Sequence, residues 1–192
     1  VGTKKGGDFL DRNGLRDGKL YVWVSDTGET LPSQFNTSGS LAGTWVEIDN
    51  SPDLSQASQN GVTGFDEYGY PTQGNLWLQA QALKAFGFSR PEDVAYNPRK
   101  PNQVILASTG VDTYDVDATT GNGADTFGTM YKITTNFNTF EVDLEIVYDG
   151  DADPSRALRS PDNLDWADNG YLLVQEDEAE EDTLSGDEVL FG

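Results

Sequence analysis

Three short apolar runs decide the fold of this chain: VILAS at residues 104–108, TMYKI at 129–133 and LEIVY at 144–148. Each run is rich in aliphatic, β-branched or aromatic residues, and polar turn residues separate one run from the next, which is the pattern of short β-strands. Working outward, four more runs have the same character: KLYVWV (Lys19–Val24), TWVEI (Thr44–Ile48), YLLVQ (Tyr171–Gln175) and EVLF (Glu188–Phe191). The sequence therefore predicts a mostly β protein.

One segment departs from the strand pattern. LWLQAQALKAF (Leu76–Phe86) is rich in helix formers, with Asn75 before it as a possible N-cap and Gly87 after it as a stop. We expect an all-β fold with this one short helix. The spacing of the strands suits either the blades of a β-propeller or a β-sandwich.

The net charge is strongly negative. The 192 residues include 33 Asp and Glu against 12 Lys and Arg, a formal charge of −21 at pH 7. Such a surface repels nucleic acid and anionic membranes, so we expect neither as a partner. No apolar run approaches the ~18 residues that a membrane span needs. Two explanations of the charge stay open: carboxylates that bind hard cations such as calcium, and an acid-rich, salt-adapted surface.

Cysteine and histidine are both missing from the sequence. This excludes disulfides, thiol nucleophiles, zinc fingers and histidine bases within the segment, so its chemistry must use carboxylates, Arg, Lys or Tyr. The length predicts a single domain over residues 1–192. Both ends look cut from a longer chain, and we expect a partial domain, truncated at both ends.

Arg90-Pro91-Glu92-Asp93 is the first of three acidic clusters. Proline fixes its own φ and is expected to push Arg90 toward an extended conformation, so that the two carboxylates leave the loop in a defined direction. That arrangement suits metal ligation. A turn that begins at proline and carries solvated acids is the alternative.

The second cluster is Ser160-Pro161-Asp162-Asn163, and the third is Gln175-Glu176-Asp177-Glu178. The Asp and Asn oxygens of the second cluster suit calcium, or satisfy local backbone donors in an Asx turn. Acids crowded at the end of a strand, as in the third, call for a cation or an arginine unless that end is solvated. A fourth acidic segment, residues 112–125, has the Asp-x-Asp spacing of a calcium loop. It does not match an EF-hand, because it lacks the Glu at the loop's twelfth position and the flanking helices.

The three main clusters and the runs between them resemble, in order, the PhoX-type alkaline phosphatases. The segments that carry the resemblance are FSRPEDV (Phe88–Val94), VILASTG (Val104–Gly110), GTMYKI (Gly128–Ile133), SPDNL (Ser160–Leu164) and YLLVQED (Tyr171–Asp177). Upstream, Leu15–Val24 and GTWVE (Gly43–Glu47) also look like that family, so the resemblance covers most of the chain.

The resemblance implies part of a secreted six-bladed β-propeller that hydrolyses phosphate monoesters at a central site of iron and calcium ions. It implies Glu92 and Glu176 as metal ligands with a catalytic role. It also implies further ligands or their supporting partners: Asp93, Asp162, Asn163 and Asp177. Arg90 and Arg159 are candidates for contacting the phosphate, although an arginine paired with a surface acid is the alternative.

This chain departs from the family pattern in two places. Glu178 stands where family members usually have Gly after the second Glu-Asp pair, and a family cysteine ligand has no counterpart here. A non-catalytic, calcium-binding propeller of the cell surface or of a larger assembly is therefore the alternative function. For either function we expect a secreted, periplasmic or cell-surface location. We also expect the rest of the propeller or a surface assembly as a partner, since an incomplete propeller leaves strand edges open.

Overall fold

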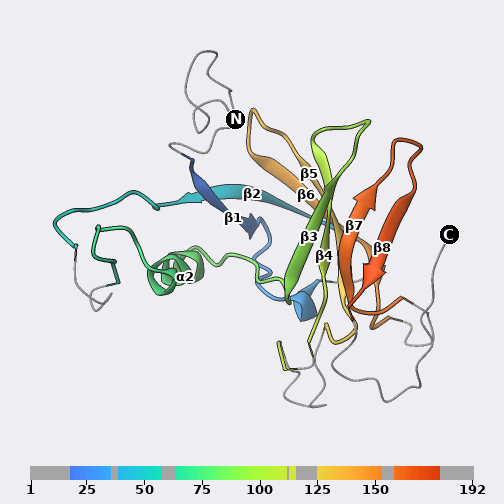
Figure 1. Ribbon diagram of the computed structural model, residues 1–192, viewed down its shortest axis with the longest axis horizontal. Helices are drawn as coiled ribbons and strands as arrows, with labels where there is room; N and C mark the ends of the chain where they lie inside the picture. The colour runs from blue at the N-terminus through green and yellow to red at the C-terminus, as the bar shows by residue number, and fades with distance from the viewer. Residues whose placement is uncertain are drawn as a thin grey trace. The chain divides into compact units, whose positions relative to one another are not determined.

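The computed structural model describes residues 18–35, 39–57, 64–111, 113–115, 125–152 and 158–177. Within these ranges the chain is mostly β, with one α-helix and one short 3-10 helix (Figure 1). The elements are β1 (Leu20–Ser25), η1 (Pro32–Gln34), β2 (Ser40–Ile48), α2 (Gln73–Ala82), β3 (Pro91–Tyr96), β4 (Gln103–Ser108), β5 (Thr129–Thr135), β6 (Glu141–Asp149), β7 (Pro161–Trp166) and β8 (Leu172–Glu176). This confirms the mostly β class with one helix.

Six strands form one sheet in the order β1-β2-β6-β5-β4-β3. From β3 to β6 each strand pairs antiparallel with the next one along the chain, and β6 then pairs with β2. Short turns join β3 to β4 and β5 to β6, whereas residues 109–128 connect β4 to β5. At the β5–β6 turn, Phe140 N donates to Asn136 O at 2.7 Å. The remaining two strands, β7 and β8, form a separate hairpin.

The chain divides into two compact units, residues 23–45 with 86–192 and residues 1–22 with 46–85. The larger unit holds a core of aromatic and aliphatic side chains: Trp23, Phe35, Phe86, Leu106, Tyr131, Ile133, Val142 and Leu144. Phe86 and Tyr131 lie at its centre, with their ring centroids 6.4 Å apart in an edge-on arrangement. Four residues of β4 and five of β5 are buried, which explains why the sequence runs VILAS and TMYKI clearly predict strands.

The smaller unit contains α2 and the polar loop that leads to it. Thr72 caps the helix, because its side-chain oxygen accepts the backbone N–H of Asn75. One turn further on, Gln79 fixes the loop with two hydrogen bonds to the backbone of Asp49, of 2.8 and 2.9 Å. No residue of the helix is buried.

The hairpins β3–β4 and β7–β8 are built alike. Each begins at a proline whose preceding residue has a positive φ: 51° at Arg90 and 46° at Ser160. Each has a register irregularity directly after the proline. In each, the residue that follows the second strand donates its N–H to the residue before the proline: Thr109 to Arg90 and Asp177 to Ser160, both at 2.9 Å. The two hairpins are therefore copies of one structural unit.

The structure corrects several expectations. The helix spans Gln73–Ala82 rather than Leu76–Phe86, because Thr72 is the N-cap in place of Asn75 and the positive φ of 57° at Lys84 ends it before Gly87. Arg90 is not extended: it lies in the left-handed region, where its carbonyl accepts the N–H of Thr109. Strands β3 and β7 begin at Pro91 and Pro161, within the acidic clusters, and their polar sequences did not indicate strands. The strand expected at Glu188–Phe191 lies outside the described residues.

Candidate functional site

The three acidic clusters meet where several strands begin or end. Pro91, the first residue of β3, pairs with Ser108, the last of β4, and Ser108 also pairs with Thr129, the first of β5. Pro161, the first of β7, pairs with Glu176, the last of β8. Strand β7 packs against β3 and β4, as Figure 1 shows. The tertiary structure thus gathers segments 70 or more residues apart at one end of these strands.

Arg90 is the centre of this group. Its guanidinium Nη2 lies 3.2 Å from an Asp177 carboxylate oxygen and 3.7 Å from a Glu92 carboxylate oxygen. Nη1 donates to the carbonyl of Gly110 at 3.5 Å. The side chain is only 34% exposed, so its charge is less screened than that of a surface arginine. One cation therefore holds two of the candidate carboxylates, one from each hairpin.

Asp93 and Glu176 are held by backbone donors. Asp93 accepts the N–H of Leu164, in β7, at 2.8 Å through one carboxylate oxygen and the N–H of Val94 at 2.7 Å through the other. The first bond ties β3 to β7. Glu176 accepts the N–H of Arg159. Asp93 therefore connects β3 to β7, and Glu176 connects the end of β8 to the residue before Ser160.

The contacts described for the other candidate residues are with residues other than Arg90. Asn163, in β7, donates its side-chain N–H to the carboxylate of its neighbour Asp162 at 3.0 Å. The guanidinium of Arg159 stacks on the Phe127 ring, 4.6 Å from its centroid. The structure thus brings Arg90, Glu92 and Asp177 together and gives the others separate contacts.

The donor set can be tested against the calcium and iron that the family resemblance implies. Carboxylate oxygens are hard donors and suit calcium chemically. Within the described ranges, however, no group of three or more His, Cys, Asp or Glu is arranged to hold a metal ion. Arg90 instead supplies the positive charge between Glu92 and Asp177. The described residues alone do not form a metal cage.

The burial of one residue of this region has no direct signal in the sequence. Asp125 lies in the segment before β5 and is 0% exposed, although its neighbours in the sequence are polar and glycine-rich. Its carboxyl group contacts the hydroxyls of Thr129 and Ser108 at 2.9 and 3.0 Å. Burial, the largest cause, raises the pKa of Asp125 to about 7. The sequence analysis placed Asp125 in the fourth acidic segment and did not reveal its burial, because only the tertiary structure buries it.

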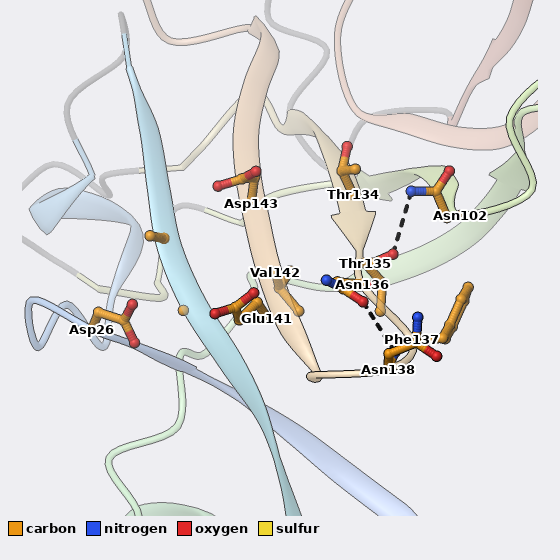
Figure 2. Close-up of a pocket in the computed structure, with 12 residues that line it drawn as sticks. Asp26, Asn102, Thr134, Thr135, Asn136, Phe137, Asn138, Glu141, Val142 and Asp143 are labelled. Carbon is orange, nitrogen blue, oxygen red and sulfur yellow. Dashed lines mark hydrogen bonds between the residues drawn. The ribbon is translucent and has the colours of Figure 1, made fainter.

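A polar cavity of about 630 Å³ lies away from the acidic clusters (Figure 2). It surrounds the turn between β5 and β6, and its lining includes Asp26, Asn102, Asn136, Glu141 and Asp143. The side-chain N–H of Asn102 donates to the carbonyl of Thr135 at 3.3 Å. The side-chain oxygen of Asn136 accepts the backbone N–H of Asn138 at 3.0 Å. None of the site residues expected from the sequence lines this cavity.

The fold and site describe a mostly β protein with a carboxylate and arginine cluster at the strand ends. A family model described as alkaline phosphatase PhoX matches residues 5–191. The chain belongs to this family. No curated protein and no solved structure matches it. In the described part of the chain, no helix has the length and apolar character needed to cross a membrane.

Proposed function

We propose that the site around Arg90 hydrolyses phosphate monoesters in a metal-dependent reaction. Membership of the alkaline phosphatase family supports a phosphatase with a small phosphoester substrate. The observation that carries the placement of the site is the guanidinium of Arg90, held between Glu92 and Asp177 from two different hairpins. A guanidinium binds phosphate oxygens through two parallel N–H donors.

The residues of the cluster have complementary roles in this proposal. Arg90 binds and orients the phosphate, exchanging carboxylate contacts for phosphate contacts. Glu92 and Glu176 are the proposed metal ligands with a catalytic role, and Asp93, Asp162, Asn163 and Asp177 are further ligands or supports. Arg159 is a second phosphate contact. Calcium and iron, when bound, supply charge stabilisation for phosphoryl transfer. Ligands beyond the described ranges would complete such a site.

We extend the proposal to the architecture and location. Strands β3–β6 form one blade of a six-bladed propeller, and β7–β8 begin the next. The repeated hairpin supports this, since its two copies place a proline, a positive φ and a register irregularity at matching positions. The propeller is secreted, periplasmic or at the cell surface, and further blades complete it.

The test combines metal analysis with an activity assay on the full chain. Metal content is measured by mass spectrometry, and hydrolysis of para-nitrophenyl phosphate is followed with and without a chelator. We expect iron and calcium in the protein and loss of turnover with the chelator. Glu92→Gln and Glu176→Gln should each reduce turnover to background, because the amide loses the negative charge that a ligand needs.

Glu145→Gln is the matched control, since Glu145 lies in β6 and pairs with Lys132 at 2.7 Å, outside the acidic clusters. It should leave turnover unchanged. Full activity in both Glu92→Gln and Glu176→Gln would refute the assignment of these residues. Bound calcium without turnover would instead favour the alternative, a non-catalytic calcium-binding propeller.

A further inference from the structure

Among the residues that the structure describes, Asp125 is a buried acid without a charged partner. Lys19, Arg90 and Lys132 form ion pairs with other acids, and none of these pairs includes Asp125. Its carboxyl group instead faces two hydroxyls, of Ser108 and Thr129. An ionised carboxylate in such a place is costly unless strong donors surround it.

The protons available around Ser108 favour a neutral Asp125. Ser108 is 0% exposed, and its single hydroxyl proton faces two oxygens, the carbonyl of Ser89 and Oδ2 of Asp125 at 3.0 Å. A carbonyl oxygen can only accept, so the hydroxyl donates to Ser89. The second contact is then a hydrogen bond only if Asp125 carries a proton on Oδ2 and donates it to Ser108. Thr129 donates to the other carboxyl oxygen, Oδ1, at 2.9 Å.

The electrostatic surroundings agree with a neutral acid. Burial is the main cause that raises the pKa of Asp125. The hydroxyls of Thr129 and Ser108, which could donate to an ionised carboxylate, lower this pKa, and the nearby charges of Asp151 and Asp149 raise it further. Tyr131 and Tyr114 also face this group, and burial raises the pKa of both phenols, so they stay neutral. No positive charge contributes to the shift.

The chain of hydrogen bonds leads from Asp125 to the Arg90 turn. Asp125 connects through Ser108 to the carbonyl of Ser89, the residue before Arg90. The same carbonyl accepts the N–H of Gly110 at 3.2 Å, and the carbonyl of Asp125 accepts the N–H of Val111 at 2.9 Å. The acid therefore joins the segment before β5, the end of β4 and the turn that presents Arg90.

We propose that Asp125 is a positioning residue that works as a neutral carboxylic acid, donating to Ser108 and thereby fixing the Ser89–Arg90 turn. Its effect on activity rests on the proposed function, whereas its protonation does not. The sign of the linkage follows from its two states. The unfolded chain loses this proton near the ordinary pKa of 3.8, whereas the folded chain keeps it until about 7. Stability from this group therefore falls as pH rises through that window and levels off above it.

Asp125→Asn tests the proposal, because an amide keeps one donor for Ser108 and one acceptor for Thr129 but cannot ionise. The free energy of unfolding is measured in urea across the pH range for the full chain. The folding equilibrium constant of Asp125→Asn divided by that of the wild type should rise by up to about tenfold per pH unit between about pH 5 and pH 7. Asp125→Ala, which loses both hydrogen bonds, should be less stable than Asp125→Asn throughout.

Two further measurements make the test decisive. At about pH 5.5 the infrared spectrum of the wild type minus that of Asp125→Asn should contain the C=O band of one protonated carboxylic acid. Asp143→Asn, at an exposed position of β6, is the control for the loss of one negative charge. A pH-independent ratio for Asp125→Asn, or a difference spectrum without a carboxylic-acid band, would overturn the proposal. These readouts need no turnover, so they are independent of the proposed phosphatase activity.

Discussion

Gly128 stands where β4, β5 and β7 meet, and replacing it with alanine tests how tightly these strand ends are packed. Its φ is +84°, which an L-residue rarely adopts. A Cβ at this position would lie 2.6 Å from Cδ of Pro161 and 2.7 Å from the carbonyl oxygens of both Ser108 and Thr109. Two of these three atoms belong to the backbone, so they cannot move aside without shifting a strand end.

The magnitude follows from two separate costs. The left-handed conformation costs alanine about 1–2 kcal/mol. Overpacking against fixed atoms adds about 1–3 kcal/mol. Gly128→Ala should therefore lower the free energy of unfolding by about 2–5 kcal/mol, before the gain from a less flexible unfolded chain.

Gly28→Ala is the matched control, because Gly28 has a φ of +95° and nothing lies within 4 Å of its Cβ position. Gly28→Ala therefore has the same cost of a left-handed conformation and the same gain from a less flexible unfolded chain, but it causes no overpacking. Urea unfolding followed by far-UV circular dichroism should show Gly128→Ala less stable than Gly28→Ala by about 1–3 kcal/mol. Equal losses in the two variants would refute the close packing of β4, β5 and β7 at Gly128.

Two other predictions concern the core and a local acid. Leu144→Ala removes a side chain that is 1% exposed in the core and should lower the free energy of unfolding by about 2–5 kcal/mol in urea. Val147→Ala, at a position that is 42% exposed, should change it by about 0.5 kcal/mol or less, and equal effects would contradict the described burial. The hydroxyls of Ser25 and Thr27 donate to Glu29 and hold its pKa below the ordinary value. Ser25→Ala should therefore raise the pKa of Glu29 in an NMR titration, and an unchanged pKa would show that this hydrogen bond does not form.

Much of the fold could be predicted because burial is encoded locally. The runs VILAS and TMYKI contain consecutive apolar residues, so β4 and β5 are visible without any knowledge of their partners. β3 and β7 were missed as strands, because PEDVAY and PDNLDW are largely polar and become strands only through pairing with β4 and β8. The shared pattern of proline, acid or amide, and aliphatic residue in these two segments was the available signal of the repeated hairpin.

The features of the candidate site also separate into those that the sequence determines and those that the tertiary structure determines. The sequence by itself determined the mostly β class, the excess of acids and the clusters that begin at Arg90, Ser160 and Gln175, because composition and spacing are local properties. Only the tertiary structure decided that Arg90 pairs with Asp177, 87 residues away, and that Asp125 is buried beside Ser108. The charge state of an acid depends on its solvent exposure and on the donors around it, and strands distant in the sequence supply both.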